Sequence, residues 1–489
     1  MPENDQTPLL YDADVIPIPN IESNSLSKET QKSSWIFYVS AFAADLLLLS
    51  VGSLNVFPSV VFPILKNNNT DINPFGEPMT PIEESIIMSV SGISALISFL
   101  LMAKISDKIG RKWSMVGLGV SLVGSFTALA FGTHVYIYML AYFLNGFFSA
   151  GIMINVSIYN SEISKEDNRA WIGCIVGLSM PAGNLYGYIF GAIINDNVKL
   201  ICLICALPCV LHLLLAYYLI ESPTYLTSKW RKVEALKALS KLRRYTNYSD
   251  IEKEYQSIED FSFTGNDIRK VTLFSLFKTR VSRKALLIGI LLFAAQQLSG
   301  SPIIIAYLVP IFNDAGTLLS GNIISIIYGS LQLGVCILAT FIVNWFGRKP
   351  LILISTLGCA ISILFLGAYF YIKDNNIAPI QDIRLLPLAC IVLFCISYGI
   401  ALGPIPMVLI GELFRNEQRA MGVAIITIVF CLVSTGNTFS YPQLKVLAGE
   451  YLSLVLYGLI TFVALFLLFK YLPETKGKSF VEIQEILSK

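Results

Sequence analysis

Amide side chains recur inside long apolar segments of this sequence, close to glycines and prolines. Gln296 and Gln297 are adjacent, Gln332 lies in a second apolar segment and Asn184 in a third. A polar side chain in an apolar surrounding costs free energy unless it finds a hydrogen-bond partner, so such residues make sense mainly around a cavity. Amides can replace the water that a hydroxylated solute sheds, and aromatic faces can cover its C–H side. We therefore predict a polar cavity for a small hydroxylated solute, with amide bonding between helices as the alternative.

A second set of residues carries charge at the ends of the apolar segments, and this set occurs twice. The first copy contains Asp107–Lys112, Glu162–Arg169 and Glu221. The corresponding residues of the second copy are Asn344–Lys349, Glu412–Arg419 and Glu474. Because the three signatures repeat in the same order, we infer that six segments were duplicated in parallel into twelve.

The segments that hold these residues are long enough to cross a membrane. Of 489 residues, 55% are hydrophobic and 14% are charged, against about 25% charged in a soluble protein. A hydrocarbon core of about 30 Å needs about 20 mostly apolar residues in a helix. The twelve expected spans are Trp35–Phe62, Ile86–Ile105, Ser114–Phe131, Val135–Tyr159, Ala170–Ile193, Leu200–Leu219, Ala285–Phe312, Ile323–Trp345, Leu351–Tyr371, Leu385–Ile410, Ala420–Tyr441 and Tyr451–Phe469. We predict an all-α integral membrane protein of twelve transmembrane helices in two pseudo-symmetric six-helix bundles.

Lysine and arginine orient the spans through the positive-inside bias. With a cytosolic start, five of the 35 basic residues fall on outer loops, and both termini are expected in the cytosol. The expected division is a tail at 1–33, a first bundle at 34–219, cytosolic linker helices at 220–283, a second bundle at 284–471 and a tail at 472–489. Within the linker, Glu234–Arg244 has apolar residues at helical spacing, which predicts an amphipathic helix, with a disordered linker as the alternative.

Taken together, the motifs resemble those of the sugar porter family of the major facilitator superfamily, over Trp35 to Ile486. They are Asp107–Lys112, Tyr159–Arg169, Glu221–Pro223, Gln296–Gly300, Gly347–Pro350, Gly403–Pro406, Gly411–Phe414 and Pro473–Phe480. Within this family, Gly183, Asn184 and the run Ile311–Gly316 look most like the insect facilitated trehalose transporter-like members, beside the facilitative glucose transporters. The resemblance implies the major facilitator fold and facilitated diffusion of a small sugar, trehalose or hexose-like, by alternating access.

The resemblance also assigns roles to particular residues. Gln296 and Gln297 match the glutamines that hold sugar, Gln332 matches an amide that faces the cavity, and Tyr307 matches a tyrosine of the outer gate. Asn184 is a further candidate. A charge latch at the cytosolic gate, formed in the outward-facing state and broken as the cavity opens inward, is expected from Asp107, Arg111, Glu162, Arg169, Glu221, Arg348, Glu412, Arg419 and Glu474, with a purely topogenic role as the alternative.

Proline is expected to break span 10. Pro404 and Pro406 each remove a backbone donor and clash with the preceding turn, so the helix should bend there. We interpret the break as the moving element of the second half, with an ordinary packing kink as the alternative.

Several sugar contacts of the family are missing. Gly177 stands where the hexose carriers have glutamine, Pro302 where an asparagine is usual, and Met407 and Cys431 where tryptophans are usual. These losses shrink the polar, ring-covering surface, so a disaccharide, a polyol or a less polar solute becomes possible.

We favour uniport, in which the solute moves down its own gradient, and proton-coupled sugar or polyol symport is the alternative. No nucleotide-binding phosphate loop occurs in the sequence. The proton-coupled relatives pair an aspartate with an arginine, and the matching positions here are Leu54 and Tyr142. Asp45 nevertheless lies inside a span, where a charge costs roughly 2.5 to 3.5 kcal/mol on insertion scales. We expect an interfacial or packing role for it, with proton coupling as the alternative.

Other classes of function are less well supported by the sequence. A transporter-like nutrient sensor is a third possibility, although the C-terminal tail is short. We expect no catalytic activity, no cofactor and no metal, because the two histidines, His134 and His212, have no evident nucleophile or metal partner. A formal net charge of +2 gives no bias toward nucleic acid, and none is expected as a partner.

Two short motifs bear on location. Asp5, Leu9 and Leu10 match an acidic dileucine signal, through which sorting adaptors could route the protein to endosomes or lysosomes; the plasma membrane is otherwise expected. Asn68 begins a glycosylation sequon on a predicted outer loop.

Overall fold

The computed structural model describes residues 33–194, 196–243, 248–264, 276–277, 279–377, 379–414, 416–478 and 480–488. These residues are almost entirely helical, and ten stretches of them are long and apolar enough to cross a membrane. One such stretch, Met421–Tyr471, is long enough for two crossings and departs from helical geometry at Gly449. Helix α5 (Glu166–Ile194) adds the remaining crossing in spite of its glycines and amide. The all-α, twelve-span architecture predicted from the sequence is confirmed. The sorting motif at Asp5, Leu9 and Leu10 lies outside the described residues.

Six long helices form the first half. They are α1 (Trp35–Leu65), α2 (Pro81–Ile109), α3 (Arg111–Phe131), α4 (Val135–Ile163), α5 and α6 (Val198–Leu215). Helix α1 packs against α4, α5 and α6, and most of its length is buried. The helix starts follow local chemistry: the Ser34 hydroxyl caps α1, and Thr80 and Glu83 form a capping box at α2 with Pro81 as its first residue.

Glycines allow α1 and α5 to meet backbone to backbone. A Cβ built on Gly183 would lie 2.1 Å from the carbonyl oxygen of Leu49, and one on Gly52 would lie 2.2 Å from that of Met180. No real side chain fits at such distances. Small residues therefore set the separation of these helices, as they commonly do between helices in a membrane.

The second half repeats the pattern with more interruptions. It consists of α11 (Arg280–Leu298), α12 (Ser301–Ala315), α13 (Gly321–Trp345), α14 (Arg348–Asp374), α15 (Ile380–Ile383), α16 (Leu386–Ser397), the π-helix η2 (Tyr398–Leu402), α17 (Ile405–Leu413) and α18 (Asn416–Tyr471). Helices α11 and α12 form one span that bends at Gly300, whose φ of +82° suits glycine. The short helix α15 lies in a connection between spans.

Span 10 is broken where the sequence predicted it. Helix α16 passes into the π-helix η2, and α17 restarts after Pro404 with Pro406 in its first turn. Span 11 ends differently from the prediction: α18 continues through Pro442 up to Gly449, instead of giving way to a loop near Tyr441. Gly449 has φ +78°, a conformation that side chains disfavour, and it marks the boundary between spans 11 and 12.

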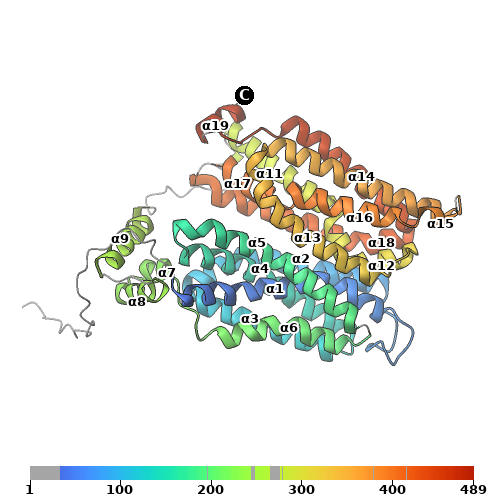
Figure 1. Cartoon of the computed structure of the whole chain (residues 1–489), viewed down its shortest axis with the longest axis horizontal. Helices are drawn as coiled ribbons and strands as arrows, with labels where there is room; N and C mark the ends of the chain where they lie inside the picture. Colours follow the sequence, from blue (N-terminus) through green and yellow to red (C-terminus); the bar gives the residue numbers. More distant parts are fainter. Residues whose placement is uncertain are drawn as a thin grey trace, which may run out of the picture.

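The two halves lie side by side, and their principal contacts are α2 with α18, α5 with α13, and α1 with α12. Figure 1 shows the first half, blue to green, alongside the second, yellow to red. In the duplication, span 2 corresponds to span 8 and span 5 to span 11. The contacts of α2 with the first part of α18 and of α5 with α13 are therefore the same contact made twice by the pseudo-symmetry.

Small helices gather at one end of the molecule, here called the linker end (Figure 1). They are α7 (Pro223–Ser228), α8 (Lys232–Leu242), α9 (Tyr248–Thr264) and, on the second half, α19 (Phe480–Ser488). Helix α8 covers most of the amphipathic helix predicted at Glu234–Arg244, beginning and ending two residues earlier. Helix α19 was not predicted, because the sequence favours a tail for its segment. The end opposite to the linker end, which holds α15 and the connection from α1 to α2, is here called the far end.

Candidate solute pathway and its charged end

Two of the predicted solute-binding amides meet between the halves. Asn184 of α5 donates a hydrogen bond from Nδ2 to Oε1 of Gln332 on α13, at 3.0 Å. Asn184 is buried, and its side-chain oxygen Oδ1 has no hydrogen-bond partner among the described residues. The sequence predicted both residues at a cavity, with helix-to-helix bonding as the alternative. In this conformation they bond to each other across the contact between α5 and α13.

The glutamine pair of α11 is tied to neighbouring helices in two ways. Nε2 of Gln296 donates to the carbonyl oxygen of Gly403, at 2.9 Å, just before Pro404 breaks span 10. The backbone carbonyl of Gln297 accepts from Nδ2 of Asn437 on α18, at 2.8 Å. Gln296 thus bonds to span 10 through its side-chain amide, and Gln297 bonds to span 11 through its backbone carbonyl.

Two polar residues at these contacts escaped the sequence analysis. Asn437 is an amide in an apolar span, which is the same signal that singled out Gln332. The hydroxyl of Ser355 on α14 donates to the carbonyl of Ser397 and accepts from the N–H of Leu402, at 3.0 Å. This hydroxyl thereby connects the two ends of the π-helix. The sequence could not single it out, because one serine in an apolar segment forms no distinctive pattern.

Helix α12 is kinked at Tyr307, whose φ of −129° and ψ of 18° are not helical. Near the kink, the N–H of Val309 donates to the Ser59 hydroxyl, at 2.9 Å, and the carbonyl of Ile305 accepts from the Tyr188 hydroxyl, at 2.8 Å. In an unbroken helix this N–H and this carbonyl would bond to each other. Two hydroxyls of the first half therefore satisfy backbone groups that the kink releases in the second half. Tyr307 itself is buried and packs against Tyr441, with ring centroids 4.8 Å apart.

The positions that depart from the family pattern differ in their surroundings. Gly177 is exposed and has open space where a Cβ would stand, while its carbonyl faces Cys336 of α13. Met407 is also exposed, and Cys431 is buried.

Charged residues of the predicted latch form one cluster in each half. In the first half, Arg111 binds Glu162 through Nε and Nη2, at 3.1 and 3.0 Å, and Asp107 through Nη1, at 2.6 Å. In the second half, Arg348 approaches Glu412 at 3.6 Å, and both side chains are more exposed than their counterparts. Asn344 stands in the second copy where Asp107 stands in the first, so the second copy has one carboxylate fewer.

The remaining latch glutamates cap helices. The carboxylate of Glu221 accepts from the N–H groups of Arg111 and Lys112, at 2.8 and 3.1 Å, which begin α3. Gly110 leaves room for that carboxylate, because a Cβ there would lie 2.4 Å from Oε2. An acidic group at a helix start satisfies free N–H donors and meets the positive end of the helix dipole.

Glu474 makes the same arrangement at the start of α14. It accepts from the N–H groups of Arg348 and Lys349, at 3.0 and 3.2 Å, and from those of Thr475 and Lys476. Burial acts to raise the pKa of this carboxyl, but the hydrogen bonds from the backbone outweigh it, and the pKa lies below its ordinary value. The repeated signature of the sequence is therefore a repeated helix cap.

Replacing Glu474 by glutamine is expected to lower the free energy of unfolding by about 1 kcal/mol at neutral pH, because an amide presents one acceptor where the carboxylate presents two. The pKa is lower in the folded state, so the stabilisation is fully present above the ordinary value of 4.5, begins to decline below it and is lost as the pH falls through the lower pKa of the folded state. Denaturation of purified protein in detergent at pH 7 and pH 4 measures both effects. E77Q, on an exposed loop, is the matched control. An equal loss at both pH values would contradict this assignment.

Arg169 and Arg419 are exposed in this conformation, and Asp45 is buried within the first half. Oδ1 of Asp45 accepts from Nδ2 of Asn160 on α4, at 2.9 Å, and Oδ2 has no partner among the described residues. The described residues contain no group of three or more His, Cys, Asp or Glu side chains placed to hold a metal ion.

The far end contains ion pairs that the sequence did not reveal. Lys66 binds the buried Glu84 at 2.6 Å, and Lys445 binds both Asp314 and the buried Glu450, at 2.9 and 2.7 Å. Between the halves, Nε2 of Gln443 donates to the hydroxyl of Ser85 and the carbonyl of Pro81, at 3.2 and 3.3 Å. Gln443 thereby bridges α2 and α18, whereas each ion pair stays within one half. Lys445 and Glu450 lie near each other in the chain, but the other partners are far apart, so no local pattern links them.

Two duplicated helical bundles with polar side chains along their contact define a membrane transporter of the major facilitator type. The model of the family "Sugar (and other) transporter" matches residues 49–487, and the chain belongs to that family.

Among curated proteins, the chain is 27% identical over 456 residues to the facilitated trehalose transporter Tret1 of Drosophila willistoni, covering 92% of this chain and 51% of that one. It therefore spans about half the length of this relative. It is also 27% identical over 467 residues to a facilitated trehalose transporter Tret1-2 homolog of Drosophila sechellia, covering 94% and 93%. Among solved structures, the inward-open form of the xylose transporter XylE of E. coli has a TM-score of 0.76 at 21% identity, covering 92% of this chain and all of that one.

Proposed function

We propose that this protein moves a small sugar, trehalose or hexose-like, across a membrane by facilitated diffusion with alternating access. The observation that carries the proposal is the hydrogen bond between Asn184 and Gln332. It puts two of the predicted solute-binding amides on opposite halves at one contact, where relative movement of the halves would release them to a hydroxylated solute. The names of the curated relatives support a sugar as the solute.

The distribution of contacts supports an inward-facing conformation, with the linker end in the cytosol. At the far end, Gln443 bridges the halves through Ser85 and Pro81. At the linker end, the charge clusters around Arg111 and Arg348 each stay within one half. The proposed latch between halves would form when the linker end closes and would recruit Arg169 and Arg419, which are now exposed.

Uptake by purified protein in liposomes tests the proposal. We expect saturable equilibration of at least one labelled sugar from a panel of trehalose, hexoses and polyols, with no accumulation above the external concentration. Empty liposomes give the background. Folded protein that moves none of these compounds would overturn the proposal.

A glutamine at position 177 should favour hexoses. Gly177 is exposed next to α13 and has room for a side chain, so G177Q would add one amide to the proposed pathway. Two good hydrogen bonds to a solute are worth about 2 kcal/mol, which corresponds to roughly thirtyfold in affinity. We expect a lower KM for glucose and a smaller change for trehalose, measured in the same liposomes. G177L is the control, because it fills the space without the amide; equal effects of the two variants would count against solute contact.

Proton-coupled symport is the second candidate, and the unpartnered Oδ2 of Asp45 is the observation that favours it. A buried carboxylate oxygen without a donor is a natural site for a proton. Under coupling, an imposed pH gradient would drive uphill uptake, and D45N would abolish it. Under uniport, the gradient changes nothing and D45N still equilibrates its solute.

The remaining assignments concern the cell. We place the protein in the plasma membrane, with passage through endosomes or lysosomes if the motif at Asp5, Leu9 and Leu10 recruits sorting adaptors. Asn68 is exposed on the far-end loop, which would be accessible to glycosylation in this orientation. A shift in electrophoretic mobility on deglycosylation, absent in N68Q, tests both the modification and the orientation.

A further inference from the structure

A groove opens at the linker end of the first half, where α8 approaches the ends of three spans. Its volume is about 570 Å³. The start of α1, the start of α3 and the segment that follows α6 form one side, and α8 forms the other. Its aromatic and basic lining residues are Trp35, Lys112, Tyr217, Tyr218, Lys237 and Lys241.

The groove carries more positive charge than its acidic residues can balance. Lys237 and Lys241 are exposed one turn apart on α8, and Lys112 lies close enough to repel Lys241 electrostatically. Two glutamates also line the groove: Glu221 caps α3 and attracts Lys112 more strongly than Lys241 repels it, and Glu234 binds Arg231 outside the groove lining. Three lysines against these two carboxylates leave the lining with a net positive charge, concentrated at Lys237 and Lys241. A ligand of the groove should therefore be anionic.

The aromatic residues place the groove at the level of the lipid headgroups. Trp35, Tyr217 and Tyr218 are 52%, 86% and 42% exposed, and Trp35 packs edge-on against Tyr218. Tryptophan and tyrosine favour the boundary between lipid and water. Exposed apolar residues of α6, including Leu214, continue from the groove along the span, where an acyl chain would lie.

We propose that this groove binds an anionic phospholipid, with the headgroup held by Lys112, Lys237 and Lys241 and the acyl chains lying along α1 and α6. Basic residues beside a membrane attract anionic lipids, each by an amount equivalent to about fivefold in affinity. The occupant is a lipid rather than a free phosphate compound because the charged wall is continuous with apolar, lipid-facing surface.

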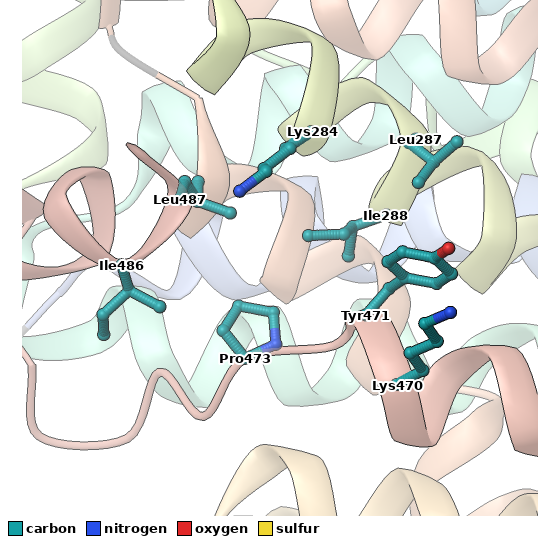
Figure 2. Close-up of a pocket in the computed structure, with 8 residues that line it drawn as sticks. All are labelled: Lys284, Leu287, Ile288, Lys470, Tyr471, Pro473, Ile486 and Leu487. Carbon is teal, nitrogen blue, oxygen red and sulfur yellow. The ribbon is translucent and has the colours of Figure 1, made fainter. Parts of the chain in front are cut away.

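The duplication supplies a second groove of the same kind, which supports the assignment. Figure 2 shows it between α11, the end of α18 and α19, with Lys284 and Lys470 on its walls beside Tyr471. Span 7 corresponds to span 1 and span 12 to span 6, and α19 packs against α11 as α8 packs against α1. Ile288 and Leu487 form its apolar part. Both halves thus have lysine and tyrosine beside an amphipathic helix at the linker end.

The test measures lipid retained by the full chain. Protein is taken from membranes of phosphatidylcholine with one-fifth phosphatidylserine, and the bound lipids are counted by native mass spectrometry. We expect phosphatidylserine to be enriched severalfold over its share of the membrane. K237Q/K241Q should weaken its apparent affinity about thirtyfold, whereas K253Q, an exposed lysine of α9 away from the groove, should leave it unchanged.

Further variants separate a loss of lipid binding from a loss of folding. K237R/K241R keeps the charge and should retain phosphatidylserine, and thermal unfolding in detergent shows whether each variant is folded. If K237Q/K241Q does not fold, K112Q alone should still weaken binding about fivefold. Water-soluble glycerophosphoserine should not displace the lipid. The proposal is overturned by the absence of enrichment, by an equal loss in K253Q, or by displacement with the soluble headgroup.

Discussion

Replacing Gly183 by alanine is expected to destabilise the first half by about 3 kcal/mol, the upper part of the range for an overpacked core. The added methyl group would lie 2.1 Å from the carbonyl oxygen of Leu49 and 2.9 Å from Cα of Gly52. Both are backbone atoms, so no side chain can turn aside, and α1 and α5 must separate along their length. The free energy of unfolding in detergent micelles measures the loss directly.

The same helix offers the control. Gly177 has nothing within 4 Å of the position where its Cβ would stand, so G177A should leave stability unchanged or raise it by up to about 1 kcal/mol through helix propensity. Helix α5 thus carries two glycines with opposite expected responses to one methyl group. If both variants were equally stable, the close approach of α1 and α5 would be wrong.

The sequence predicted the fold well because a membrane leaves few choices. Apolar length alone determines where a helix must cross, since unpaired backbone groups are too costly in hydrocarbon. Pro404 fixed the break in span 10 for an equally local reason. Failures occurred outside the hydrocarbon: α18 continues past Tyr441 to Gly449, and α19 forms where a tail was expected. Outside the hydrocarbon, water can hydrogen-bond the backbone of a loop as well as a helix end. Contacts with other helices therefore determine whether such a segment is helical.

The candidate site was predicted less completely. The cost of burying an amide identified Gln296, Gln332 and Asn184, but it could not say which partner each amide would find. The partners depend on how the halves stand relative to each other, and Asn184 and Gln332 bond only because α5 and α13 are in contact. The ion pairs of Glu84 and Glu450 could not be predicted at all, because a single carboxylate near a span end has the appearance of an ordinary charge.

The charge cluster of the first half provides the second large effect. R111M is expected to lower the free energy of unfolding by about 3 kcal/mol, because it leaves the poorly solvated Glu162 without its cation; the exposed Asp107 contributes little to this loss. The Arg111 side chain is 10% exposed and that of Glu162 is 14% exposed, so water cannot replace the lost partner fully. Methionine keeps much of the arginine's apolar volume, so the change removes mainly the charge and the hydrogen bonds. Chemical denaturation of purified protein in detergent measures the loss.

R348M is the matched variant in the second half, and it should cost about 1 kcal/mol, the value for a more exposed pair. Arg348 stands 3.6 Å from Glu412, and the side chains are 20% and 29% exposed. Glu221 and Glu474 hold their helix starts through backbone N–H groups, so neither variant removes a cap. The ratio of the stability losses in R111M and R348M therefore measures how much weaker the second charge cluster is than the first. Equal losses would mean that the second cluster tightens in solution and that its wide spacing does not describe the folded protein.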